Sequence, residues 1–433
     1  MRKSLIIGIL KETKQGETRA PITPADVHWL RKRKIKVEVE SNPARVFKDA
    51  DYKECGARIV KRFEKASLLL GIKEPNVFDL YKNKIYAVFS HTTKGQSKNM
   101  PLLKECKRRK VTLIDYEKIT DAYGRRLVFF GRFAGICGAA DSLYYFGKRM
   151  EWERVQNPFS ALKPVVSYHS LAALKTAMAK TAHQIKKMGI PKKLSPFIIG
   201  VTGHGNVSGG ISEALEPLRP IEIHPKDMKR FVHHQKHIRN RVYKIVFYRE
   251  EKLRSKDGSG FYFEEYLEHP KRFESNLDCY LPHLNMLLHG SYWDNRYPRL
   301  VTMDMVRGLY GKGFRLKFIG DISCDMGGSM ELTYKTTSID APTFTYNIVK
   351  DRFVDGYESE GITMLARDNL PAELPKDATR DFSSVVRDYA YQIAAHGVKD
   401  ITNHIAIPKE VRGAVIVQGG RLTKAYSYLK KYL

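Results

Sequence analysis

The sequence predicts an α/β protein built on Rossmann-like, doubly wound parallel sheets, and three observations lead to this class. Short apolar runs, typical of buried strands, alternate with polar stretches, typical of helices, from the N-terminus to Ile114. A second series of apolar runs begins at Phe197 and leads into a glycine-rich turn. A chain of 433 residues with 42% hydrophobic residues is long enough for two or three domains. We therefore expect two lobes.

The first part of the chain begins with a strand, a helix and a second strand. Residues 5–10 form an apolar run, and Pro24 after Thr23 predicts a helix start, because proline is favoured at the first helical position. Residues 36–40 alternate between apolar and polar side chains, as a strand does. Further strands are predicted at residues 67–72, 85–89 and 111–114, each separated from the next by a polar and helical stretch. Such alternation indicates a mostly parallel sheet.

A long amphipathic helix is predicted at residues 170–188, where apolar side chains recur at helical spacing. Gly189 and Pro191 would end it. A helix of this length could link the two lobes. The second series of strands follows it, with apolar runs at residues 197–201 and 221–223.

The net charge of +28 creates a field that attracts anions, including nucleic acid. The basic residues are scattered and no recognition motif accompanies them, so we do not expect nucleic-acid binding. No apolar run approaches the roughly 18 residues that a membrane span needs, and no cleavable apolar segment opens the chain. We expect a cytoplasmic protein without membrane association. The five cysteines never form the close pairs that hold zinc, so we expect reduced thiols and no metal site.

The turn after the first strand of the second series has the pattern of a dinucleotide-binding loop. Gly203 would form the tight turn, Gly205 would let the backbone approach a pyrophosphate, and the small Ser208 would allow close packing of helix and strand. Asn206 and Val207 would begin a helix whose N-terminus faces the phosphates. The alternative is an ordinary glycine-rich turn at a strand end, which would leave three well-placed small residues unexplained.

The residues after the next predicted strand favour NADP over NAD as the cofactor. An acid commonly binds the ribose 2′-hydroxyl at this point, but the candidate position here is His224. Lys226, Lys229 and Arg230 follow it, and such a basic edge suits a 2′-phosphate. NAD remains the alternative, since Glu222 could reverse the preference.

Charged side chains also stand at the ends of the apolar strands in the first part of the chain. Lys73 and Glu74 follow one strand, His91 follows the next, and Glu117 follows a third. Because ligands bind at the carboxyl ends of parallel strands, we expect these groups on one rim of one sheet. Such a cluster suits proton transfer. Taken singly, each has an ordinary explanation, such as a solvated lysine or a histidine that satisfies a local hydrogen bond.

Motifs spread over nearly the whole chain carry a family resemblance. They include GIKEP at 71–75, FSHTTK at 89–94 and TGHGNVS at 202–208, together with segments at 11–13, 19–21, 114–118, 124–126, 130–131, 292–293, 298–300, 320–325, 327–329 and 368–372. Through them the chain resembles the lysine-2-oxoglutarate reductase domain of the bifunctional aminoadipic semialdehyde synthases. It is more distantly similar to single-chain saccharopine dehydrogenases and to the alanine dehydrogenase/transhydrogenase superfamily.

The resemblance implies roles for particular residues. Lys73 and His91 would form an acid/base pair, and Asp325 would help to hold the nicotinamide half of the cofactor. Substrate-binding charges would fall on Arg19, Glu74, Glu117 and Arg126. These roles agree with the chemistry, because the carboxylates of 2-oxoglutarate and lysine need guanidinium partners and the lysine ammonium needs a carboxylate.

The resemblance also implies an architecture and an activity. Residues 1–160 and 350–433 would form a discontinuous substrate and catalytic domain, residues 161–349 a dinucleotide-binding Rossmann domain, and a cleft would lie between them. The expected oxidoreductase reaction is the condensation of L-lysine with 2-oxoglutarate to saccharopine with NAD(P)H, or its reverse. Because no saccharopine-cleaving domain follows before Leu433, we expect a separate enzyme for that step.

Two other functions stay open. One is a related amino-acid dehydrogenase such as alanine dehydrogenase, against which the segments at 292–293 and 321–325 argue. The other is a non-catalytic basic binding protein on the same fold, against which the presence of both Lys73 and His91 argues.

Overall fold

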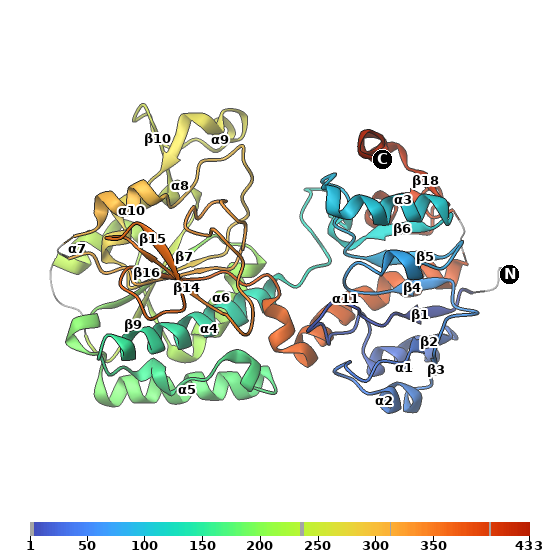
Figure 1. The fold of residues 1–433 in the computed structure, drawn as a ribbon, viewed down its shortest axis with the longest axis horizontal. Coiled ribbons are helices and arrows are strands. Elements are labelled where there is room, and N and C mark those ends of the chain that lie inside the picture. The colour runs from blue at the N-terminus through green and yellow to red at the C-terminus, as the bar shows by residue number, and fades with distance from the viewer. Residues whose placement is uncertain (1–3, 234–237, 312, 398–399) are drawn as a thin grey trace. The chain divides into compact units, whose positions relative to one another are not determined.

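The structure is a computed structural model that describes residues 4–233, 238–311, 313–397 and 400–433. The chain divides into two compact units (Figure 1). The first unit combines the segment that ends at Phe130 with the segment that starts at Pro375, and the second unit is Gly131–Leu374. Each unit contains one eight-stranded, mostly parallel sheet. The predicted α/β class with two Rossmann-like units is therefore confirmed.

The sheet of the first unit has the strand order β18-β17-β6-β5-β4-β1-β2-β3. Figure 1 shows β6 to β3 as a stack of blue strands in this order. The parallel strands are β1 (Ile7–Ile9), β2 (Val37–Glu40), β3 (Arg58–Val60), β4 (Leu68–Leu70), β5 (Ile85–Val88) and β6 (Thr112–Asp115). The antiparallel edge consists of β17 (Val415–Gln418) and β18 (Arg421–Leu422). Since β1, β4, β5 and β6 are parallel neighbours, the residues after them meet at one edge.

The helices of the first unit are α1 (Pro24–Lys32), α2 (Asp49–Glu54), α3 (Met100–Arg108), α11 (Pro375–His396) and α12 (Lys409–Gly413). Helix α1 begins where the sequence predicted, with Thr23 as the capping residue. The Asp26 carboxylate accepts a hydrogen bond from Ser383 (2.5 Å) and pairs with Arg387 (2.6 Å). These contacts join α11 to α1, and so bring the C-terminal segment into the same core as the N-terminal one.

The sheet of the second unit has the order β15-β14-β16-β13-β12-β7-β9-β8. Its parallel strands are β7 (Phe197–Thr202), β8 (Ile221–Glu222), β9 (Val242–Phe247), β12 (Met286–His289), β13 (Phe318–Asp321) and β16 (Ile362–Leu365). The antiparallel edge consists of β14 (Phe344–Asn347) and β15 (Arg352–Asp355), and β10 (Leu253–Ser255) pairs separately with β11 (Phe273–Ser275). The direct neighbour of β7 is therefore β9, and β8 lies beyond it.

The helices of the second unit are α4 (Gly131–Trp152), α5 (Leu171–Met188), α6 (Asn206–Leu215), α7 (Met228–His233), α8 (Arg249–Lys252), α9 (Phe263–Glu268) and α10 (Met303–Leu309). Helices α4 and α6 lie side by side (Figure 1). They approach so closely that a Cβ at Gly135 would collide with the Val207 carbonyl, and one at Gly210 with the Arg132 carbonyl. Only glycine fits at these two positions.

The limits of the two units differ from those that the sequence suggested. Helix α5 lies wholly within the second unit, so the prediction that it links the lobes is wrong. The chain passes between units at 130/131 and 374/375, where the sequence suggested 160/161 and 349/350. The reason is that α4 packs on α6, and that β14, β15 and β16 complete the second sheet.

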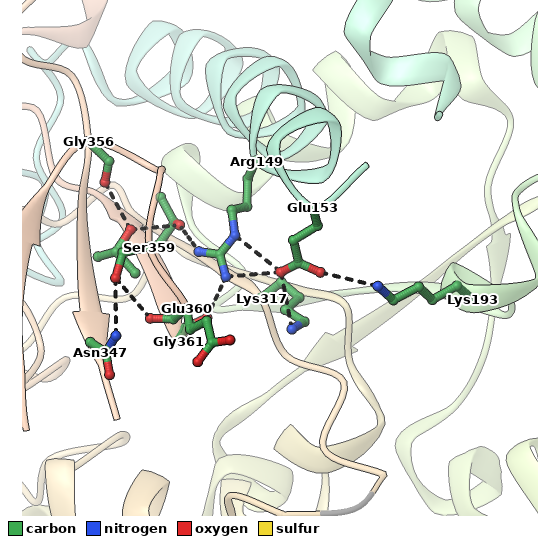
Figure 2. A network of polar contacts seen from close by, with 11 residues as sticks. Arg149, Glu153, Lys193, Lys317, Asn347, Gly356, Ser359, Glu360 and Gly361 are labelled. Atoms are coloured by element: carbon green, nitrogen blue, oxygen red, sulfur yellow. Dashed lines mark hydrogen bonds and ion pairs between the residues drawn. The ribbon is translucent and has the colours of Figure 1, made fainter. Parts of the chain in front are cut away.

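A polar network fastens the C-terminal half of α4 to the second sheet (Figure 2). The side chain of Arg149 is fully buried and donates to Thr363 Oγ1 on β16 (2.9 Å). It also pairs with Glu153 (3.0 Å), which in turn pairs with Lys317 (3.2 Å) and the more exposed Lys193 (3.6 Å). Since Lys317 directly precedes β13, the network anchors the helix at the amino edge of the sheet.

We expect Arg149→Met to lower the free energy of unfolding of the second unit by about 2–4 kcal/mol, because it removes a buried member of an ion-pair network. Because the two lysines keep Glu153 paired, the loss of stability should be smaller than the loss expected when a buried charge is left without any partner. Urea unfolding followed by tryptophan fluorescence, in a background that lacks Trp29 of the first unit, measures the change. The control is Lys193→Met, where loss of a largely exposed pair should cost under about 1 kcal/mol. Equal losses of unfolding free energy in both variants would contradict the role of Arg149 as the buried anchor of the network.

Within the described residues, no helix is both long and apolar enough to cross a membrane. The same residues contain no group of three or more His, Cys, Asp or Glu side chains placed to hold a metal ion.

Candidate active site

The carboxyl edge of the first sheet gathers ionisable side chains from four neighbouring strands. Glu12 follows β1, Lys73 and Glu74 follow β4, His91 follows β5, and Glu117 follows β6. The structure thus brings the sequence-predicted Lys, His and two Glu to one rim. Their roles in a reaction stay predictions, but the arrangement has the mixture of acids and bases that proton transfer requires.

His91 and Glu74 are hydrogen bonded directly. The distance from His91 Nδ1 to Glu74 Oε1 is 2.5 Å. This hydrogen bond raises the pKa of His91, although burial opposes the shift. Burial alone would raise the pKa of Glu74, but His91 outweighs it and the pKa falls. The backbone of His91 is left-handed (φ +50°), and its carbonyl accepts a hydrogen bond from Asn99 Nδ2 (2.7 Å), so the imidazole is held in place.

We expect Glu74→Gln to lower the pKa of His91, because the substitution removes the carboxylate that favours the imidazolium. The wild-type pair stabilises the fold at pH values below the raised pKa of His91 and above the lowered pKa of Glu74. That contribution is lost as the pH rises through the first value or falls through the second. NMR titration of the imidazole resonances measures the change, with Glu64→Gln at an exposed position as the control. An unchanged His91 titration would show that Glu74 does not set its protonation.

Glu12 is a member of this rim that the sequence analysis did not single out. Its carboxylate accepts the backbone N–H groups of Ile72 (2.6 Å) and Lys73 (3.0 Å), so it fixes the start of the loop that carries Lys73. Burial raises the pKa of Glu12 to about 7, against the lowering effect of these two hydrogen bonds. Glu12 could have been found by the sequence pattern that pointed to Lys73, which is a charged residue just after an apolar strand.

The two arginines expected to bind substrate occupy different environments. Arg19 is buried, forms two hydrogen bonds with Glu17 (2.7 and 2.5 Å) and stacks over the Phe130 ring at 4.1 Å. Arg126 is exposed and pairs with Glu117 at 3.2 Å. Arg126 is therefore open to an incoming anion, whereas Arg19 is engaged by a carboxylate that sequence reasoning did not consider.

A buried hydrogen-bonded group supports the loops of His91 and Glu117. Asp115, the last residue of β6, accepts hydrogen bonds from Ser90 Oγ (2.6 Å) and from the Glu117 backbone N–H (2.9 Å). Ser90 is also hydrogen bonded to Thr92 (2.8 Å). These contacts tie the end of β5 to the end of β6, which limits the relative movement of the imidazole and the carboxylate.

The glycine-rich turn of the second unit has the geometry of a dinucleotide-binding loop. Gly203 has φ +96°, and a Cβ there would lie 2.8 Å from Ser291 Oγ and 2.9 Å from Ser208 Oγ. Gly205 caps α6, and a Cβ on it would meet no atom within 4 Å, so its backbone is open to a ligand. Ser208 Oγ donates to the Thr202 carbonyl (3.0 Å) and holds α6 against β7. The exposed first turn of α6 fits a pyrophosphate.

The strand order changes where a ribose would lie. In this fold the ribose-binding residue follows the strand next to the one with the glycine turn. That strand is β9, so the position passes from His224 to the residues after Phe247, among them Arg249. His224 follows the outer strand β8, where it is exposed and accepts a hydrogen bond from the Lys226 N–H (3.3 Å). Asp325 is exposed and follows β13, two strands from β7.

Comparison with known proteins gives relatives along nearly the whole chain. The chain is 31% identical over 444 residues to alpha-aminoadipic semialdehyde synthase of Arabidopsis thaliana. The alignment covers 98% of this chain and 41% of that protein. It is 24% identical over 400 residues to saccharopine dehydrogenase [NAD(+), L-lysine-forming] of Emericella nidulans, covering 89% and 92%. The chain thus spans about two-fifths of the length of the plant synthase.

A solved structure and two family profiles agree with these relatives. An L-alanine dehydrogenase has the same fold, with a TM-score of 0.64, 19% identity and 99% coverage of both chains. The profile of the alanine dehydrogenase/PNT N-terminal domain matches residues 8–137, and that of the C-terminal domain matches residues 292–425. The chain therefore belongs to the alanine dehydrogenase/PNT family.

Proposed function

We propose that this protein is an NAD(P)-dependent oxidoreductase that condenses L-lysine with 2-oxoglutarate to form saccharopine, or runs the reverse reaction. The observation that carries the proposal is the single sheet edge on which Lys73, His91, Glu74 and Glu117 meet. The similarity to aminoadipic semialdehyde synthase and to a lysine-forming saccharopine dehydrogenase supports the choice of substrates.

The charges on this edge suit two anionic substrates, one of which also carries an ammonium group. In the proposal, Arg126 and Arg19 attract carboxylates, because guanidinium groups bind carboxylates in a bidentate manner. Glu117 already forms an ion pair with Arg126. A substrate carboxylate that binds Arg126 therefore either displaces Glu117 or joins it in a larger network. Glu74 and Glu117 offer carboxylates to the lysine ammonium.

Lys73 and His91 serve as the groups that move protons in the proposed reaction. The lysine amine attacks the 2-keto carbon of 2-oxoglutarate, and the resulting carbinolamine loses water to give an imine. One of the two residues accepts the proton that the attacking amine releases and passes it to the ketone oxygen, which becomes the carbinolamine hydroxyl. The other residue gives a second proton to that hydroxyl as it leaves as water, so the imine forms in its protonated state. His91 suits the donor role, because its hydrogen bond to Glu74 raises its pKa and keeps a larger fraction protonated near neutral pH. A bound nicotinamide supplies the hydride for reduction of the imine.

For the cofactor we propose NADP as the preferred form. Arg249 follows the strand beside β7, where an arginine can accommodate a 2′-phosphate. Its guanidinium lies 4.7 Å from the Phe263 ring centre, an arrangement that orients it while leaving its donors available. Glu222, the last residue of the outer strand β8, pairs with Lys244 at 2.9 Å and so competes less for a ribose hydroxyl.

The proposal is tested by following oxidation of NADPH and of NADH in the presence of 2-oxoglutarate with lysine, ornithine, alanine or ammonia. We expect turnover only with lysine, and a higher kcat/KM for NADPH. Arg249→Ala should reduce this preference for NADPH, whereas Lys271→Met, which removes one exposed positive charge elsewhere in the same unit, should not. The same assay is run with pyruvate and ammonia, and equal turnover there would favour an alanine dehydrogenase-like activity and overturn the choice of lysine.

A further inference from the structure

A buried lysine beside the glycine-rich turn has no role in the function described so far. Lys252, at the end of α8, is only 7% exposed. Its backbone is fixed on both sides, since its N–H donates to the Tyr248 carbonyl (3.2 Å) and its carbonyl accepts from the Asn276 N–H (2.7 Å). Its ammonium group donates to Ser291 Oγ at 2.8 Å.

The strand order places this ammonium at the turn. Lys252 comes after β9 and Ser291 comes after β12, and β7 lies between these two strands. To reach Ser291, the lysine side chain therefore spans the carboxyl end of β7, where the chain turns at Gly203. The Ser291 hydroxyl is 2.8 Å from the position that a Cβ on Gly203 would take. The amine and the hydroxyl thus adjoin the turn that fits a pyrophosphate.

The charge of Lys252 lacks a counter-charge in direct contact. Burial lowers the pKa of Lys252 to about 8, an effect that Arg249 increases and that Glu250 and Glu251 oppose. In the described part of the chain, no carboxylate forms an ion pair with this lysine. The Glu251 carboxylate accepts the Tyr248 N–H (2.9 Å) as the cap of α8. A buried ammonium without an anion is costly, so this site is arranged to receive one.

The neighbouring histidine is uncharged. His289, the last residue of β12, is fully buried and hydrogen bonded to Thr202 Oγ1 (2.7 Å), and its Nε2 has no hydrogen-bond partner among the described residues. Burial lowers the pKa of His289 to about 3, with Lys252 as a further contributor, so the imidazole is neutral. Among the described residues, neither this imidazole nor a paired carboxylate therefore neutralises the charge of Lys252.

We propose that Ser291 contacts the pyrophosphate of the bound dinucleotide, and that Lys252 is the positioning residue that directs and polarises its hydroxyl. This inference rests on the proposed dinucleotide binding at the turn. An ammonium group can only donate, so the Ser291 oxygen accepts from Lys252 and its own proton stays free for a phosphate oxygen. The positive charge behind the hydroxyl strengthens that donation. The pyrophosphate is shared by NAD and NADP, so both cofactors are bound in this way.

Isothermal titration of the full chain with NADPH and with ADP tests the proposal. Lys252→Met and Ser291→Ala should each weaken both ligands about ten- to a hundredfold, as loss of a charge-assisted hydrogen bond does. Because the two residues act as one unit, the double variant should bind no more than about twofold more weakly than either single variant. Lys252→Met should melt at the wild-type temperature or above it, since it relieves a buried charge. A purely structural role would instead lower stability and binding together.

The control is Lys271→Met, which removes one positive charge from an exposed position of the same unit. If Lys252→Met weakens ADP no more than this control does, only the general field is involved and the inference is wrong. A third outcome is that Lys252→Met and Ser291→Ala both bind normally while Gly205→Val does not bind. In that case Lys252 and Ser291 are not part of the phosphate site, but the dinucleotide still binds at the glycine-rich turn. If the wild-type chain binds neither ligand, the proposed dinucleotide function fails, and this inference fails with it.

Discussion

Gly205→Val should abolish binding of NADPH and NADH while leaving the fold intact. The backbone of Gly205 is extended (φ −89°, ψ −166°), and a Cβ there meets no protein atom within 4 Å, so the structure accepts a valine. The branched side chain would instead fill the space through which a pyrophosphate approaches the first turn of α6. We expect the Kd to rise by more than about a hundredfold, equivalent to about 2.7 kcal/mol. Fluorescence titration with NADPH measures it, and circular dichroism checks the fold.

The matched control is Gly209→Ala on the same helix. Its Cβ also meets no atom within 4 Å, but its N–H already donates to the Gly205 carbonyl (2.9 Å) and is not available to a phosphate. This variant should bind NADPH normally and gain up to about 1 kcal/mol of stability from better helix propensity. If Gly205→Val binds NADPH as the wild type does, the dinucleotide does not rest on this turn.

Lys73→Met and His91→Gln should each lower turnover by about 10²- to 10⁴-fold, with modest changes in KM, since general acid/base groups contribute that much. The double variant should lose less than the product of the single losses, because groups that act as a unit fail together. The pH profile of each single variant should lack one limb of the wild-type curve. Steady-state kinetics with lysine, 2-oxoglutarate and NADPH over a range of pH measures all three effects.

Two further variants keep this test specific. His91→Asn retains a residue type that tolerates the left-handed backbone at this position, so its loss of turnover reports on the imidazole and not on strain. Lys82→Met removes an exposed lysine from the loop before β5, at the opposite edge of the same sheet, and should be neutral. Near-normal turnover in both Lys73→Met and His91→Gln, with an unaltered pH profile, would place the chemistry elsewhere.

Much of the candidate site could be predicted because its signals are local in the sequence. An apolar run followed by a charged residue gave the strand ends at Lys73, His91 and Glu117, and the parallel sheet then put those ends on one edge. The same signal was present at Glu12 and was not used. The partner of Arg19 was harder to foresee, since Glu17 lies only two residues away but meets it through the conformation of a loop.

The sequence by itself determined the α/β class, the positions of β1, β2 and β4 to β8, the cap of α1 at Thr23 and the conformation of the glycine turn. Each of these depends on the chemistry of adjacent residues, through apolar periodicity, capping or backbone freedom. Only the tertiary structure decided that β9 lies beside β7, which moves the position expected for a ribose from His224 towards Arg249. It alone buried Glu12, which raises the pKa of that carboxyl, and it brought the carboxylate to the N–H of Lys73, 61 residues further along the chain. It also brought Lys252 to Ser291 across the end of a third strand. Strand order, burial and long-range hydrogen bonds depend on how the whole chain packs, and no local pattern carries that information.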